Sequence, residues 1–133
     1  MSPDAVTLAE NTIHNPEEKR RFMTVDPVVG SVRILFGNTV IAWSQNALRL
    51  QEVGRQMYDP VLYLPRSDVV AELEQTEKAT HCPLKGDCSW FSLVSQGGDN
   101  IAWSYQAPFE FANLIKGRVA FDARRVTIEE HPA

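Results

Sequence analysis

The eleven residues from 80 to 90, THCPLKGDCSW, bring together a histidine, two cysteines and a lysine. His81, Cys82 and Cys88 are all zinc-ligand types, but a structural zinc ion takes four ligands, which usually arrive as Cys-x-x-Cys pairs. Here five residues separate the two cysteines, and no second pair exists. We therefore expect neither a metal ion nor another cofactor in this protein.

Cys82 is a candidate nucleophile, with His81 or a remote histidine as its base. The thiol precedes a proline and lies near Lys85, and cationic neighbours favour the reactive thiolate. The alternative is that both cysteines are ordinary core residues, and Cys88 in particular lies in an apolar segment. Both interpretations stay open, with both thiols expected to be free because the sequence lacks a secretory signal.

The same segment also predicts a tight turn. Pro83 presets one backbone angle, Gly86 permits a positive φ, and Lys85 is expected between them at the rim. Such a turn can offer backbone N–H groups and an ammonium to an anion. It can equally be a plain connection whose lysine is solvated, and the sequence leaves these two alternatives equal.

The elements that must position this turn are mostly strands. Alternating apolar residues and turn signals predict two hairpins, one closed by Gly37 and Asn38 and the other by residues 96–100. Further strands are expected over 47–53, 61–65 and 118–130, and a short helical turn or strand after Ser67. One helix is expected over 109–117. The sequence Ile-Ala-Trp-Ser occurs twice, at 41–44 and 101–104, and both tryptophans are expected to pack in the core.

Composition sets the fold class and the broad class of function. With 133 residues and 44% hydrophobic content, the chain is expected to form one mainly β (α+β) globular domain over 21–133, preceded by a flexible arm over 1–20. A net charge of −4 argues against a nucleic-acid partner. The apolar runs are far shorter than the roughly 20 residues that span a bilayer, so we expect no membrane partner and a cytoplasmic location.

Two motifs give the sequence a family resemblance. It resembles the family catalogued as domain of unknown function 427, which is also labelled nucleotidyltransferase-like. The first motif is His-Cys-Pro-x-Lys-Gly at 81–86 and the second is Tyr-x-Pro-Arg-x-Asp-Val at 63–69. The resemblance implies a β-tent-like architecture of leaning antiparallel sheets. It also implies a zinc-free branch, because the zinc-bearing relatives carry Cys-x-x-Cys pairs that this sequence lacks.

The nucleotidyltransferase label finds no support in the residues. Metal-dependent nucleotidyl transfer needs paired acidic ligands, such as Asp-x-Asp or Asp-x-Glu after a Gly-Ser turn. Gly30 and Ser31 are adjacent, but no aspartate is followed two residues later by an acidic residue, and there is no Walker-type glycine loop.

Three functions follow as hypotheses. In the first, the two motif loops line one cleft that binds a small molecule or anion; its ligand contacts would come from Tyr63, Arg66, His81, Lys85, Trp103 and Tyr105. The plainer alternative is that the aromatics are core residues and that Arg66 pairs with Asp68 or Glu72 on the surface. The second hypothesis is a cysteine-dependent enzyme that uses Cys82. The third is a protein-interaction module, and a homodimer through a sheet edge fits any of the three.

Overall fold

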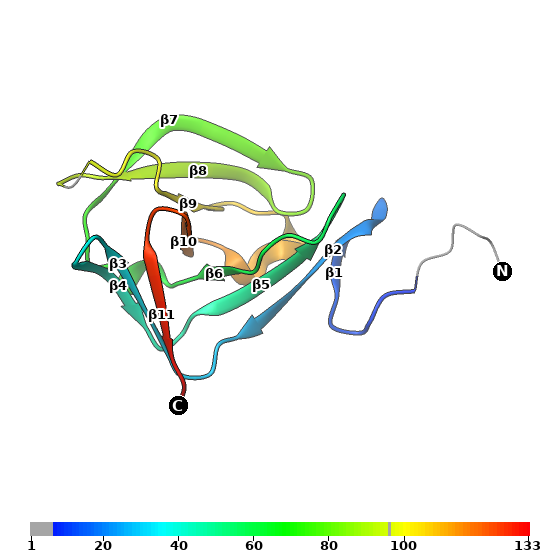
Figure 1. The fold of residues 1–133 in the computed structure, drawn as a ribbon. Coiled ribbons are helices and arrows are strands. Elements are labelled where there is room, and N and C mark those ends of the chain that lie inside the picture. The colour runs from blue at the N-terminus through cyan, green and yellow to red at the C-terminus, as the bar shows by residue number, and fades with distance from the viewer. Residues whose placement is uncertain (1–6, 96) are drawn as a thin grey trace.

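The fold is described by a computed structural model that covers residues 7–95 and 97–133 (Figure 1). In this part of the chain the backbone forms eleven strands and two short 3-10 helices. In order these elements are β1 (Ile13–Asn15), β2 (Glu18–Pro27), β3 (Ser31–Phe36), β4 (Thr39–Ser44), β5 (Leu48–Val53), β6 (Val61–Tyr63), η1 (Arg66–Asp68), β7 (Leu73–Cys82), β8 (Gly86–Leu93), β9 (Ala102–Ser104), η2 (Glu110–Ile115), β10 (Val119–Phe121) and β11 (Thr127–His131). The expected mainly β class is confirmed.

The described strands form three antiparallel sheets. Sheet A has the order β1-β2-β5-β6, sheet B the order β11-β3-β4, and sheet C the order β10-β9-β8-β7. Sheets A and C meet at one edge, where the backbones of Leu64 and Val119 exchange hydrogen bonds of 2.9 and 2.8 Å. The more specific expectation of a β-tent-like architecture remains a prediction.

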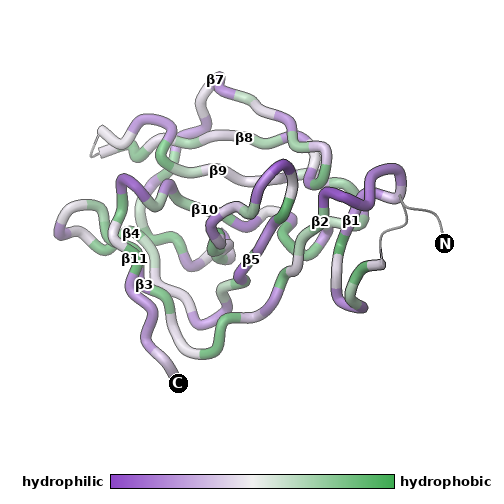
Figure 2. Tube along the Cα trace, turned by 45° about the vertical axis from the view of Figure 1, so that its right-hand side comes forward, coloured by the Kyte–Doolittle hydropathy of each residue, from purple (hydrophilic) through white to green (hydrophobic). Residues whose placement is uncertain are grey.

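Both expected hairpins form. Strands β3 and β4 pair around Gly37, whose φ of +61° is the left-handed conformation that glycine adopts without strain. Strands β8 and β9 form the second pair, although Gln96 in its turn lies outside the described residues. In Figure 2 hydrophobic and hydrophilic residues alternate along many strands, as one buried face requires.

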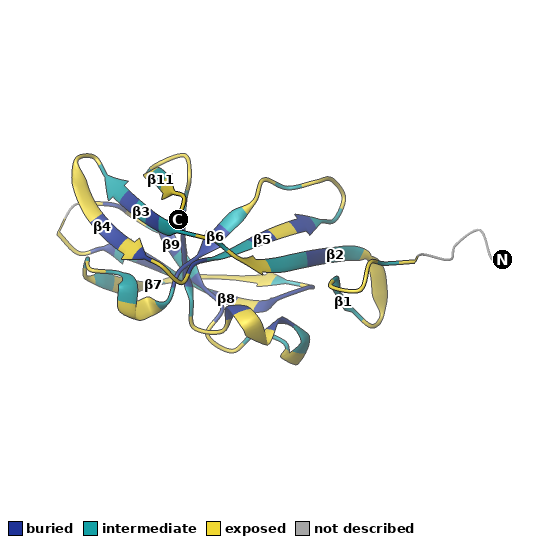
Figure 3. Ribbon diagram, turned by 90° about the horizontal axis from the view of Figure 1, so that it is seen from below, coloured by how far each residue is buried: buried dark blue, intermediate teal, exposed yellow. Residues whose placement is uncertain are grey.

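The buried residues, dark blue in Figure 3, form a core of two clusters. The first joins sheets B and C and includes Val32, Ile34, Phe91 and Phe121. The second joins sheets A and C and is built around the large side chains of Met23, Leu50, Tyr63, Leu84, Tyr105 and Ile115. Sheet C therefore contributes to both cores, and its strand β7 is the most exposed of its four strands.

Three expectations differ from the fold. Residues 13–20, assigned to the arm, form β1 and the start of β2, because pairing with β5 extends sheet A; residues 1–6 of the arm lie outside the described residues. The helix expected over 109–117 is the 3-10 helix η2, interrupted at Ala112. The expectation that Trp43 packs in the core was wrong. The residue is 46% exposed, because it lies on the outer face of edge strand β4.

Candidate functional site

The turn between β7 and β8 is held in one conformation by its glycine. Cys82 ends β7 and pairs with Gly86, which begins β8. Gly86 has a φ of +111°, which side-chain-bearing residues rarely adopt. A Cβ at this position would lie 3.3 Å from the backbone nitrogen of Phe109, so the turn also packs closely on the segment before η2. The backbone therefore needs glycine here.

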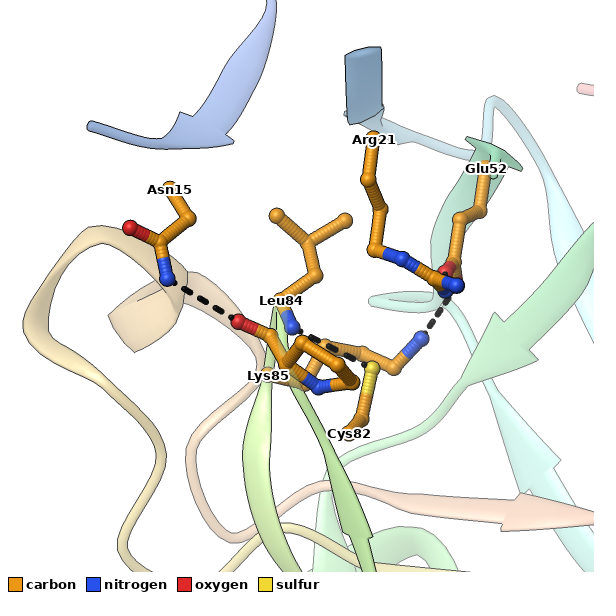
Figure 4. Close-up of polar contacts among 7 residues, drawn as sticks. Asn15, Arg21, Glu52, Cys82, Leu84 and Lys85 are labelled. Carbon is orange, nitrogen blue, oxygen red and sulfur yellow. Dashed lines mark hydrogen bonds and ion pairs between the residues drawn. The ribbon is translucent and has the colours of Figure 1, made fainter. Parts of the chain in front are cut away.

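Lys85 is buried inside the molecule instead of standing at the rim (Figure 4). Only 7% of the residue is exposed, and its Nζ donates a hydrogen bond to Oε1 of Glu52 on β5. Arg21 on β2 binds the other carboxylate oxygen, Oε2, at 3.2 Å. The expectation of a lysine at the rim was wrong, because the turn folds inward against sheet A and a buried ammonium needs a counter-charge.

A second contact fixes the same turn to sheet A. The side-chain amide of Asn15, on β1, donates to the carbonyl oxygen of Pro83 over 3.2 Å (Figure 4). Leu84, the central residue of the turn, is fully buried in the second core. The His-Cys-Pro-x-Lys-Gly turn is thus anchored to β1 and β5, and it clasps sheet C onto sheet A. We call this arrangement the clasp.

Cys82 is a half-buried thiol at the base of the clasp. Its Sγ accepts a hydrogen bond of 3.4 Å from the backbone N–H of Leu84. The nearby Lys85 ammonium is directed to Glu52. His81 precedes Cys82 on the same strand, so the two side chains point to opposite faces. The His81 ring is exposed, and its Nδ1 lies 2.8 Å from Oδ1 of Asp87.

Cys88 lies two residues beyond the clasp and is a core residue. It is 3% exposed and packs in the second core. Burial raises the pKa of its thiol, because the thiolate would lose its hydration.

The three predicted aromatic residues lie together. Trp103 donates its indole N–H to the hydroxyl of Tyr63 over 3.2 Å, and the ring centroids of Tyr63 and Tyr105 are 6.5 Å apart. Tyr63 and Tyr105 are buried, and desolvation raises the pKa of both phenols above its ordinary value. Trp103 is only partly buried, so it alone of the three keeps a substantial exposed surface.

Arg66 lies away from this group. Its guanidinium stands 4.9 Å from the centroid of the Phe91 ring, which belongs to the first core. The fold therefore brings Tyr63, Lys85, Trp103 and Tyr105 into one region and leaves Arg66 and His81 outside it.

A cleft of about 400 Å³ opens where the three sheets meet. Sheet A supplies residues of β5 and β6, sheet B residues of β3 and β11, and sheet C residues of β9 and β10. Its lining is Ile34, Arg49, Asp59, Pro60, Val61, Leu62, Trp103, Phe121, Ala123, Ile128 and Glu130. Of the predicted ligand residues, Trp103 lines this cleft.

Two of the three charged side chains that line the cleft form an ion pair with each other, and the third does not. Arg49 forms a two-point ion pair with Glu130, in which one nitrogen lies 3.2 Å from Oε2 and the other binds Oε1. Asp59 also lines the cleft, and it makes no ion pair or hydrogen bond with any other described side chain. The lining therefore carries two carboxylates and one guanidinium.

The sequence predicted Trp103 as a ligand residue of another cleft, between the two motif loops, and it gave no indication of the other lining residues. Arg49 and Glu130 are 81 positions apart, so no local spacing connects them. The strand itself gave no signal, because Arg49 alternates with Leu48 and Leu50 as an ordinary outward-facing residue would.

The described residues offer neither a metal-binding cluster nor a membrane-spanning helix. Within residues 7–95 and 97–133, no group of three His, Cys, Asp or Glu side chains is arranged to hold a metal ion. In that part of the chain, no helix has the length and apolarity needed to cross a membrane.

Comparison with known protein families places most of the described fold in one family. No curated protein matches the sequence. One family model does match, over residues 24–131. It covers both motifs, every residue that lines the cleft and all of the three sheets except β1 and the first part of β2. The chain belongs to the family described as Domain of unknown function (DUF427).

Proposed function

We propose that this protein binds a small molecule in the cleft between its three sheets. The observation that carries the proposal is the cleft itself, whose roughly 400 Å³ lies in the usual range for small-molecule sites. Its walls are mostly apolar and include the aromatic rings of Trp103 and Phe121, and a few charged groups stand among them. Such a mixture suits a flat ligand with an apolar body and a polar edge.

The cleft is a better candidate than the clasp. An anion site at the clasp would need the Lys85 ammonium, but this ammonium is buried and paired with Glu52. The space around Lys85 is filled by Leu84, Tyr105 and other members of the second core. A ligand there would have to displace a packed side chain and break an ion pair, and both cost free energy.

The clasp instead supports the cleft indirectly. Sheets A and C both supply residues to the lining, and the clasp joins these two sheets through Lys85 and Glu52. Glu52 belongs to β5, the strand that also carries Arg49 into the cleft. The two motifs of the sequence thus serve to position a site that neither of them forms.

An NMR titration tests this function. Benzamide, a flat neutral probe, is added to ¹⁵N-labelled protein while amide and indole signals are followed. The proposal expects saturable shifts at Leu62, Trp103 and Phe121, with a millimolar or tighter Kd.

Ala123→Phe is the matched variant. Ala123 is exposed at the mouth of the cleft, so a phenyl ring there should occupy the cleft without disturbing the core. The variant should fold normally and lose the benzamide shifts. Shifts that persist in the variant, or that appear only far from the cleft, contradict the proposal.

A further inference from the structure

We infer that the cleft selects planar ligands that carry a positive charge. This inference rests on the proposed function and adds the charge class of the ligand to it. It follows from the arrangement of Arg49, Asp59 and Glu130 around the two aromatic side chains of the cleft.

The guanidinium of Arg49 already has an ion-pair partner within the protein. Both of its terminal nitrogens bind Glu130, in the two-point geometry that makes Arg–carboxylate pairs strong and specific. An anionic ligand that approached Arg49 would have to compete with this built-in carboxylate. Arg49 therefore does not turn the cleft into an anion site.

Asp59 supplies an acceptor that the fold leaves unused. Asp59 is an exposed residue at the cleft, and its carboxylate has no ion-pair or hydrogen-bond partner among the side chains that the structure describes. Together with Glu130 and Arg49 it gives the lining two negative charges and one positive charge, a net charge of −1. A carboxylate beside low-dielectric walls attracts cations and repels anions.

The aromatic walls favour the same class of ligand. Trp103 and Phe121 line the cleft, and the faces of aromatic rings attract cations, most strongly in the case of tryptophan. Their apolar surface also stacks against a flat ring. A planar cation such as an amidinium on an aromatic ring would use the carboxylate and the rings together.

Three probes of nearly equal shape separate charge from shape. Benzamidine is a cation, benzamide is neutral and benzoate is an anion, and all three are flat. Titrated into the protein in low salt, benzamidine is expected to bind about tenfold more tightly than benzamide, and benzoate more weakly than either. The preference should shrink in roughly 0.5 M NaCl, because salt screens partly exposed charges.

Asp59→Asn tests the residue that carries the inference. This variant should reduce the benzamidine preference to about threefold or less while leaving benzamide binding unchanged. The matched control is Asp87→Asn, which makes the same change in net charge at the exposed partner of His81, outside the cleft lining. The control should keep the full preference.

The outcomes distinguish this inference from the proposed function. If benzamide and benzamidine bind in the cleft with equal affinity, or benzoate binds most tightly, the charge inference is overturned and the proposed function stands. If Asp59→Asn and Asp87→Asn behave alike, the inference is also overturned, because Asp59 would not be the source of selectivity. If none of the probes shifts the signals of the cleft residues, the proposed function fails and the inference fails with it.

Discussion

The ammonium of Lys85, in the turn between β7 and β8, binds the carboxylate of Glu52 near the end of β5. Both residues are buried, and Arg21 binds the same carboxylate. This contact links two sheets whose strands are distant in sequence. The His-Cys-Pro-x-Lys-Gly turn looks suited to ligand binding from its sequence, but through this contact it has a structural role.

The first prediction concerns this ion pair. Glu52→Gln leaves the Lys85 ammonium buried without its counter-charge, and we expect it to lower the free energy of unfolding by about 3 kcal/mol. Urea denaturation followed by tryptophan fluorescence measures the change. The double variant Glu52→Gln/Lys85→Met should lose less than the sum of the two single variants, since it removes both charges.

A surface ion pair provides the control for that prediction. Arg33 and Glu129 also form a salt bridge between strands, but their side chains are 42% and 35% exposed. Glu129→Gln should therefore cost less than Glu52→Gln, because water solvates the arginine that is left behind. Equal losses from the two variants would mean that the clasp contributes no more than a surface pair.

The second prediction concerns the glycine of the clasp. Gly86→Ala forces a side-chain-bearing residue to a φ of +111° and brings its Cβ to 3.3 Å from the Phe109 nitrogen. We expect a loss of about 2 kcal/mol or more in urea denaturation. Gly37→Ala is the control, because Gly37 also has a positive φ but a Cβ there meets nothing within 4 Å. If the Gly86→Ala variant proves as stable as the Gly37→Ala variant, the close packing at the turn is contradicted.

The third prediction concerns the two thiols. Cys88 is buried with a raised pKa, whereas Cys82 is half-buried. In native protein at mildly alkaline pH, we expect iodoacetamide to label Cys82 first and Cys88 only after unfolding, as shown by peptide mass spectrometry. Cys88→Ala should leave the labelling rate of Cys82 unchanged.

The labelling rate of Cys82 also tests the enzyme hypothesis. Because Lys85 is directed to Glu52, we expect Cys82 in the native protein to react no faster than in urea. A native rate well above the unfolded rate would favour a cysteine nucleophile and would speak against a purely structural clasp.

The fourth prediction concerns alkaline pH. Desolvation raises the pKa of Tyr63 and Tyr105 above the ordinary value of about 10, so unfolding releases protons at alkaline pH. The stabilisation by these phenols is fully present below about pH 10 and is lost as the pH rises toward the folded-state pKa values, at up to about 1.4 kcal/mol per pH unit for each phenol. Urea denaturation from about pH 8 to about pH 11 measures the decline.

Phenylalanine variants assign that decline to particular residues. Tyr63→Phe and Tyr105→Phe should each flatten the alkaline slope, although Tyr63→Phe also removes the acceptor for Trp103 and should cost about 1 kcal/mol at neutral pH. Tyr58→Phe removes the remaining tyrosine, which lies outside both cores, and serves as the control. An unchanged slope in both core variants would show that other groups control alkaline unfolding.

The alternation of apolar residues around turn signals predicted the two hairpins. Contacts between residues far apart in the sequence could not be predicted from such local patterns. The β3–β4 pair follows from alternation around Gly37, because its register depends on adjacent residues. The β1–β2 hairpin was missed because Glu18, Lys19 and Arg20 make its second strand look like a polar arm. That strand forms because its later residues, such as Met23, pack in the core.

The same distinction applies to the candidate site. The sequence identified the clasp residues by type but assigned Lys85 to the surface, because its partner Glu52 is 33 positions away. The cleft combines residues of six strands from three sheets, and such a meeting point depends on sheet packing, which no sequence period encodes. Trp103 was predicted as a flat wall of a cleft between the two motif loops, whereas it lies on β9 and lines the cleft between the three sheets.

A crystal structure of the protein soaked with benzamide tests the central claim most directly. If the cleft binds the ligand, planar density should appear there in contact with Trp103 and Phe121, with the Lys85–Glu52 pair intact. A cleft closed by its own side chains, with benzamide bound elsewhere or not at all, would contradict this claim.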